Sequence, residues 1–161
     1  MKYFSVCDLK SSFWQMQIRE RYQKFAGFKF EGETFTFRRV PFGLRNSGAA
    51  LFRCMGNIIK DQFKENVTVY VDIFIATKTF QEHLKIITDL FQILSQNNIV
   101  LNIEKSNSCK EIVKFVGYEI SERGFNMCKS NIEQIEKLPR PKNVRQLRGF
   151  LGLIRYYSRF F

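Results

Sequence analysis

The chain has 161 residues and a net charge of +11, because 26 lysines and arginines outnumber 15 aspartates and glutamates. This length suits one domain or part of a larger one, and 45% hydrophobic residues are enough to form a core. The positive charge favours a polyanionic partner, with nucleic acid first and a membrane surface second. No apolar stretch approaches about 20 residues, so no membrane-spanning segment is expected.

The cysteines and the histidine argue against a zinc site. The four cysteines are widely scattered without a CxxC pair, and His83 is the single histidine. Free thiols in a reducing compartment are the default expectation. No signal peptide is expected, because the first residues follow a strand pattern and not a charged region before an apolar run.

The first elements in chain order are a strand, a short turn and a hairpin. Residues 3–8 predict a strand that ends at Asp8, and residues 11–17 predict a short helix or turn. The chain opens directly on this strand, which suggests a cut through a larger domain. Residues 24–38 alternate about a glycine-containing turn and predict a β-hairpin with basic and aromatic residues. Nucleic acid could face this hairpin, although an ordinary two-sided hairpin is the simpler interpretation.

Two amphipathic helices follow. Asn46 or Ser47 can cap a helix that extends to about Lys64. The apolar positions expected on its core face are Leu51, Phe52, Met55, Ile58, Ile59 and Phe63. Residues 82–97 give the clearer helical pattern. The positions expected to point inward from it are Leu84, Ile87, Leu90, Phe91 and Leu94.

Between these helices, Asp72 lies within an apolar and β-branched run that predicts a buried strand pair. A charge in such a run is costly unless something neutralises it, and a divalent metal would do so. Asp8 ends a second apolar strand far away in the sequence. The two aspartates suggest a two-carboxylate metal site built across a sheet, and a capped turn or surface hairpin is the alternative.

The rest of the chain predicts short strands and helices. We expect strands at 99–103 and at 112–120, the latter broken by Gly117 and turning back at 122–124, then a helix at 131–138. Asn143 with Gln146 forms a capping-box pattern that opens a last helix rich in arginine and tyrosine. The order of elements predicts an α+β fold in which an antiparallel sheet packs on helices.

Six segments, in this order, resemble the motifs of the reverse transcriptases of gypsy-like LTR retrotransposons. They are motif A at residues 4–15, motif B at 39–46, the first three residues of the YVDD box at 70–72, motif D at 101–105, the primer-grip hairpin at 114–118, and the segment after the palm at 147–160. The resemblance covers nearly all of the chain.

The resemblance implies a reverse-transcriptase palm at 1–125, with a partial fingers hairpin at 24–38 and the fingers otherwise largely missing, and the start of the thumb at 126–161. The implied reaction adds deoxynucleotides from triphosphates to a primer 3′ end on an RNA or DNA template, with two Mg²⁺ or Mn²⁺ ions. Such a domain belongs to a Pol polyprotein, in a cytoplasmic retrotransposon particle or in the nucleus.

By the same resemblance, Asp8 and Asp72 match the two carboxylates that bridge the catalytic metals. Phe13 matches the aromatic gate that packs on the sugar and excludes a 2′-hydroxyl by its size, although a phenylalanine in the core is the alternative.

Further residues match nucleotide and primer contacts. Phe42 and Gly43 match the loop over the incoming base and template, where glycine permits close backbone approach. Lys105 matches a position near the triphosphate, although a solvated lysine explains it equally well. Val116 and Gly117 match the residues that place the primer terminus.

The chain also departs from the family. Ile73 stands where the family has the second aspartate of the YVDD box, and Ser47-Gly48 stands where it usually has Ala-Pro. Losing one preorganised charged group costs roughly 10² to 10³ in rate, so weakened catalysis is expected. The fingers residues that grip the triphosphate would lie before the first residue of this chain. The competing functions are a catalytically inactive nucleic-acid-binding remnant and a fragment without activity.

Overall fold

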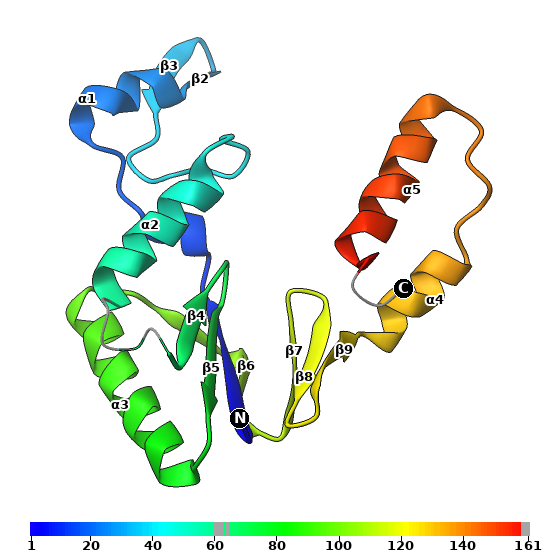
Figure 1. The fold of residues 1–161 in the computed structure, drawn as a ribbon. Helices are drawn as coiled ribbons and strands as arrows, with labels where there is room; N and C mark the ends of the chain where they lie inside the picture. The colour runs from blue at the N-terminus through cyan, green and yellow to red at the C-terminus, as the bar shows by residue number, and fades with distance from the viewer. Residues whose placement is uncertain (60–62, 64, 159–161) are drawn as a thin grey trace. The chain divides into compact units, whose positions relative to one another are not determined.

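The computed structural model describes residues 1–59, 63 and 65–158. They form two compact units, Met1–Lys110 and Glu111–Phe161 (Figure 1). The predicted α+β class with antiparallel sheets and helices is confirmed. The division into a palm at 1–125 and a thumb at 126–161 stays a prediction, because a boundary between compact units is not a boundary between functional subdomains.

The first unit is built on a four-stranded antiparallel sheet in the order β4-β5-β1-β6. The strands are β1 (Tyr3–Leu9), β4 (Val67–Val69), β5 (Ile73–Thr77) and β6 (Leu101–Lys110). The two apolar runs seen in the sequence therefore lie side by side, with Tyr3 opposite Thr77 and Cys7 opposite Ile73. β6 extends beyond the predicted strand at 99–103, because its polar residues pair with β1 although they carry no apolar alternation.

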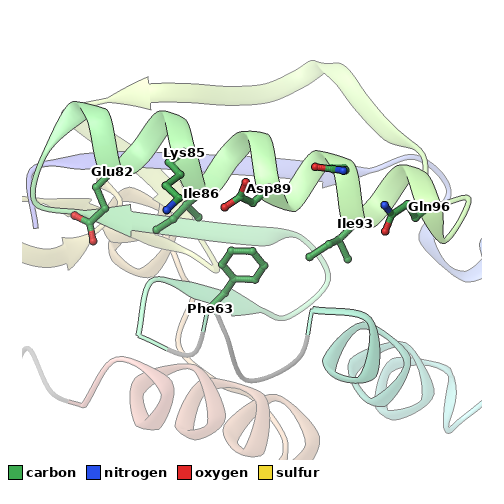
Figure 2. A pocket seen from close by; sticks show the side chains of 8 residues that line it. Phe63, Glu82, Lys85, Ile86, Asp89, Ile93 and Gln96 are labelled. Atoms are coloured by element: carbon green, nitrogen blue, oxygen red, sulfur yellow. The ribbon is translucent and has the colours of Figure 1, made fainter.

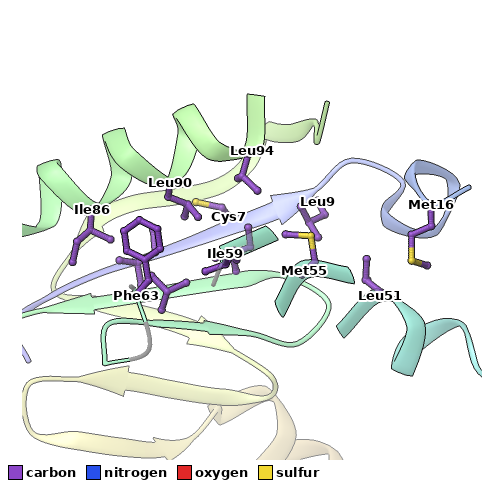
Figure 3. Close-up of a cluster of buried hydrophobic side chains, with 13 residues drawn as sticks. Cys7, Leu9, Met16, Leu51, Met55, Ile59, Phe63, Ile86, Leu90 and Leu94 are labelled. Carbon is purple, nitrogen blue, oxygen red and sulfur yellow. The ribbon is translucent and has the colours of Figure 1, made fainter. Parts of the chain in front are cut away.

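Two helices, α2 (Ser47–Ile59) and α3 (Phe80–Gln96), cover one face of this sheet (Figure 1). Their buried side chains join residues of β1, β4 and β5 in one apolar core (Figure 3). The core residues of the three strands are Cys7, Leu9, Val67, Ile73 and Ile75. The Thr79 side chain accepts a hydrogen bond from the Glu82 N–H and starts α3 before the predicted residue 82.

Some residues predicted to point inward do not. Phe52 is 58% exposed, Leu84 45% and Phe91 37%, because they lie at the edges of their helices' apolar faces. His83 and Ile86 are buried on α3 instead. The predicted helix end at Lys64 lies outside the described residues.

A small peripheral layer follows β1. Its elements are η1 (Ser12–Gln15), α1 (Glu20–Gln23), η2 (Lys24–Ala26), β2 (Gly27–Phe30) and β3 (Glu33–Thr36). The predicted hairpin at 24–38 is correct in its strands but not in its start, because residues 24–26 form a helical turn. Glu31 and Gly32 connect its strands with φ values of 49° and 83°.

The second unit contains a three-stranded antiparallel sheet and two helices. They are β7 (Ile112–Phe115), β8 (Tyr118–Ser121), β9 (Gly124–Met127), α4 (Lys129–Glu136) and α5 (Val144–Tyr156). The predicted strand at 112–120 is two strands joined by a turn at Val116 and Gly117. The Asn143 side chain accepts a hydrogen bond from the Gln146 N–H at 2.9 Å, so the predicted cap of the last helix is confirmed.

A cavity of about 540 Å³ lies along α3 (Figure 2). It is lined by Phe63, Glu82, Lys85, Ile86, Asp89, Gln92, Ile93 and Gln96. None of the predicted site residues lines it, so this cavity is not the predicted site. No helix among residues 1–59, 63 and 65–158 is both long enough and apolar enough to cross a membrane.

Candidate functional site

Asp8 and Asp72 meet at one end of the central strand pair. The last paired residues of β1 and β5 are Cys7 and Ile73, and the register continued by one residue sets Asp8 opposite Asp72. Directly opposed residues of an antiparallel pair have Cβ atoms about 5 Å apart. The two carboxylates that the sequence places 64 positions apart are therefore neighbours.

Side-chain alternation places both aspartates on the face of the sheet away from α2 and α3. Cys7 and Leu9 of β1 and Ile73 and Ile75 of β5 belong to the core under the helices. Successive strand residues point to opposite faces, so Asp8 and its partner point away from that core. Ile73 is fully buried, and its side chain lies on the face opposite to the two carboxylates.

The electrostatics agree with this proximity. Burial raises the pKa of Asp72 above its ordinary value of 3.8, the negative charge of Asp8 raises it further, and a hydrogen bond from the Leu9 backbone N–H lowers it. Burial, and then the Asp72 charge, raise the pKa of the Cys7 thiol to about 11. No cation of the described residues forms a salt bridge with either aspartate.

Two half-buried carboxylates without a cationic partner among the described residues suit a divalent ion. Carboxylate oxygens are the ligands that Mg²⁺ and Mn²⁺ prefer, and a divalent ion would remove the repulsion between Asp8 and Asp72. Within the described residues, no third histidine, cysteine, aspartate or glutamate completes a larger cluster. Asp8 and Asp72 are the two side chains here that could hold such ions.

Strand β6 borders Asp8 with an irregular segment. Asp8 pairs with Asn102 and Val6 pairs with Asn107, so the β6 residues between these pairs bulge away from β1. The Ser106 hydroxyl accepts the Asp8 N–H at 3.0 Å and donates to the Asn102 carbonyl at 2.7 Å. Lys105 lies exposed in this bulge, one residue before the serine that fixes the Asp8 backbone.

The predicted nucleotide contacts after β1 also come together. The ring centroids of Phe13 and Phe42 lie 5.5 Å apart at an interplanar angle of 85°, and Trp14 packs on Phe42 at 6.3 Å. Phe13 packs partly against the core, whereas Phe42 is 64% exposed. Gly43 has a φ of 93°, which an L side chain rarely adopts, so the loop after Phe42 requires glycine there.

Gln15 holds the loop that carries Phe13, a role that the sequence did not reveal. Its side-chain amide donates to the carbonyls of Lys10 at 2.6 Å and Val100 at 2.9 Å, and it accepts the Val100 N–H at 2.7 Å. Arg39 donates to the Gln15 carbonyl at 2.7 Å. Gln15 lies in the segment that resembles motif A, but neither spacing nor hydropathy indicates a contact 85 residues away.

Val116 and Gly117 belong to the second unit. They form the turn between β7 and β8, where Phe115 pairs with Tyr118, and Val116 is 38% exposed. A Cβ atom on Gly117 would lie 2.9 Å from the Tyr157 hydroxyl oxygen, so this turn packs tightly against the end of α5.

The comparisons with known proteins agree with these features. The family described as "Reverse transcriptase (RNA-dependent DNA polymerase)" matches residues 1–120. The chain is 32% identical over 158 residues to the Transposon Tf2-3 polyprotein of Schizosaccharomyces pombe and 34% identical over 159 residues to the Tf2-7 polyprotein. Each match covers 98% of this chain and 12% of the polyprotein, so the chain spans a small part of these relatives.

Solved structures show the same fold. A foamy viral protease-reverse transcriptase in complex with double-stranded DNA superimposes with a TM-score of 0.86 at 30% identity, over 97% of this chain and 27% of that one. The foamy viral enzyme in complex with an RNA/DNA hybrid gives a TM-score of 0.80 at 30% identity, over 96% of this chain and 21% of that one. The match to the family extends over more than half of the sequence, and the chain therefore belongs to the reverse transcriptase family.

Proposed function

We propose that this chain is the polymerase part of an LTR retrotransposon Pol polyprotein of the gypsy-like type, and that it adds deoxynucleotides to a primer 3′ end on an RNA or DNA template. The observation that carries this proposal is Asp8 opposite Asp72 at the end of β1 and β5. The relatives support it, because the foamy viral enzymes were solved with double-stranded DNA and with an RNA/DNA hybrid. A cytoplasmic retrotransposon particle or the nucleus is the proposed location.

Asp8 and Asp72 would hold Mg²⁺ or Mn²⁺. The bound ions would supply Lewis-acid stabilisation of charge on the transferred phosphoryl group. The protein contributes the placement of the two carboxylates, since paired β-strands fix both backbones and the Leu9 N–H orients Asp72. This preorganisation keeps the reorganisation cost at the site low.

The aromatic pair beside the strand end would select the sugar. Phe42 packs edge-on against Phe13 and limits the movement of that ring. A fixed ring at this position would exclude a 2′-hydroxyl by size and favour deoxynucleotides. Gly43 would allow the backbone to approach the base pair, and Lys105 would lie near the triphosphate.

The exposed turn of Val116 and Gly117 would contact the primer terminus. The net charge of +11 supports binding of the template–primer duplex, whose affinity would fall steeply with salt. The resemblance puts an acidic residue of the YVDD box where this chain has Ile73. The expected loss of roughly 10² to 10³ in rate applies only if a side chain at this position reaches the metal site, and the Ile73 side chain is buried in the core on the opposite face of the sheet.

Primer extension on an RNA template, with Mn²⁺ or Mg²⁺, tests the proposal. We expect incorporation by the 161-residue chain that is lost in Asp8→Ala and Asp72→Asn. Asp89→Asn is the matched control, because this aspartate lines the cavity along α3 on the other side of the sheet. Salt-sensitive duplex binding without incorporation would instead favour the catalytically inactive nucleic-acid-binding remnant. Incorporation that is unchanged in both aspartate variants would contradict the proposed site.

A further inference from the structure

The turn between β7 and β8 has an unusual backbone for its sequence. Val116 and Gly117 have φ values of 48° and 79°, the pattern of a two-residue type I′ hairpin turn. That turn favours Asn-Gly, because both residues adopt left-handed conformations. A β-branched residue such as Val116 is strained in this region and stays there only when surrounding contacts impose it.

Hydrogen bonds from the two helices of the same unit hold the Val116–Gly117 turn in this left-handed conformation. The Tyr156 hydroxyl donates to the Val116 carbonyl at 2.7 Å. The Gly117 carbonyl accepts from the Asn131 side-chain amide at 3.2 Å and from the Cys128 N–H at 3.4 Å. Both carbonyls of the turn are therefore held from outside the hairpin.

Aromatic contacts fix the tyrosine that holds Val116. The rings of Tyr156 and Tyr118 stack with centroids 5.6 Å apart, and the Tyr118 hydroxyl donates to the Tyr156 carbonyl at 3.3 Å. Tyr157 packs edge-on against Tyr156 at 4.8 Å and accepts a hydrogen bond from Asn131 at 2.6 Å. The end of α5 and the hairpin thus form one packed cluster.

We propose that Tyr156 is a positioning residue that keeps the Val116–Gly117 turn in its left-handed conformation, so that the position of this turn depends on the end of α5. The part of this inference that concerns the primer rests on the proposed function, in which the turn contacts the primer terminus. The role proposed for Tyr156 is exerted through the Val116 carbonyl and requires no direct contact with a substrate or metal.

The test is a double-mutant cycle between Tyr156→Phe and Val116→Asn. Asparagine adopts the left-handed region at little cost, so the turn of the Val116→Asn chain no longer needs the tyrosine hydroxyl. In the parent chain, we expect Tyr156→Phe to weaken binding of a primer–template with a recessed 3′ end about fivefold. In the Val116→Asn background, we expect the same change to weaken binding less than about twofold.

Two comparisons separate positioning from general loss of structure. A blunt duplex of the same length offers no recessed primer end, so Tyr156→Phe should leave its affinity unchanged. Tyr22→Phe, on α1 in the first unit, is the matched tyrosine control. Equal losses in both backgrounds would overturn the positioning role of Tyr156, and equal losses for recessed and blunt duplexes would overturn the part of the inference that concerns the primer.

Thermal unfolding makes the inference testable even if the proposed function fails. Tyr156→Phe should lower the unfolding midpoint by about 3 °C in the parent and by less in the Val116→Asn background. If no variant prefers a recessed end but this coupling is present, the proposed primer contact is wrong and the role of Tyr156 in the turn stands. If the midpoint falls equally in both backgrounds, the role of Tyr156 is wrong whatever the chain binds.

Discussion

Asp8 and Asp72 lie opposite each other at the end of the β1–β5 pair, and burial and then the charge of Asp8 raise the pKa of Asp72. The sheet thus brings two like charges together with no described cation to separate them. This arrangement is unfavourable for the isolated chain, and a bound divalent ion would make it favourable.

Asp72→Asn should stabilise the metal-free chain and remove its response to metal. The pKa of Asp72 is raised on folding, so between 3.8 and that raised value the folded chain binds more protons than the unfolded chain. The free energy of unfolding of the parent therefore falls as the pH rises through this window, and this fall should be smaller in the variant.

Thermal unfolding from pH 3.5 to 7, with a chelator or with Mn²⁺, measures both effects. We expect Mn²⁺ to raise the unfolding midpoint of the parent and of the control Asp89→Asn, but not that of Asp72→Asn. An equal response to Mn²⁺ in all three proteins would mean that the ion binds elsewhere.

Restoring an aspartate at position 73 should damage the chain. The Ile73 side chain is fully buried in the core below the helices, so Ile73→Asp places an unpaired carboxylate there. We expect a loss of at least about 3 kcal/mol in the free energy of unfolding, measured with urea. Ile73→Val is the control and should cost only about 1 kcal/mol. A stably folded Ile73→Asp chain with faster primer extension would show that this side chain can reach the site.

His83 should make the fold sensitive to mild acid. The Thr77 hydroxyl donates to the Thr79 carbonyl, so the imidazole Nδ1–H donates to Thr77 at 2.9 Å, and Nε2 accepts the Ser5 hydroxyl at 2.7 Å. The Ser5 oxygen also accepts the Cys109 N–H at 2.9 Å. A second proton on the ring would disrupt this chain of hydrogen bonds.

The pKa of His83 agrees with a neutral ring. Burial lowers it below 6.5, against a smaller opposite effect of Glu82. The folded chain therefore binds fewer protons than the unfolded chain below pH 6.5, and stability is lost as the pH falls through the lowered pKa. We expect the unfolding midpoint of the parent to fall between pH 6.5 and 5, and that of His83→Gln to fall less. If the unfolding midpoints of the parent and of His83→Gln fall equally with pH, other groups cause the acid sensitivity.

The strands and the aspartate pair were predictable because their signals are local. Apolar runs predict β1 and β5, and one aspartate at the end of each run predicts the meeting of Asp8 and Asp72. The Gln15 contacts were not predictable, because they join backbone groups of Lys10 and Val100 that any residue could supply.

Other features fail to appear in the sequence for different reasons. The polar residues of β6 pair through backbone hydrogen bonds, so hydropathy gives no sign of the strand beyond residue 103. In the sequence, His83 serves only as evidence against a zinc site, whereas the fold buries it among hydroxyl groups. A tyrosine pair after an amphipathic helix predicts nothing about a turn 40 residues earlier, which Tyr156 contacts.

The glycines of the two hairpin turns offer a matched comparison. Gly32 and Gly117 are both the second residue of a two-residue turn, with φ values of 83° and 79°. An added methyl group meets nothing within 4 Å at Gly32, but at Gly117 it would lie 2.9 Å from the Tyr157 hydroxyl and 3.2 Å from the Asn131 amide. The backbone cost of alanine, about 1 kcal/mol, is common to both sites. Gly117→Ala should therefore lose more free energy of unfolding in urea than Gly32→Ala, by about 1 to 3 kcal/mol. Equal losses would show that the turn is not packed against α5, and they would also remove the basis for assigning Tyr156 its positioning role.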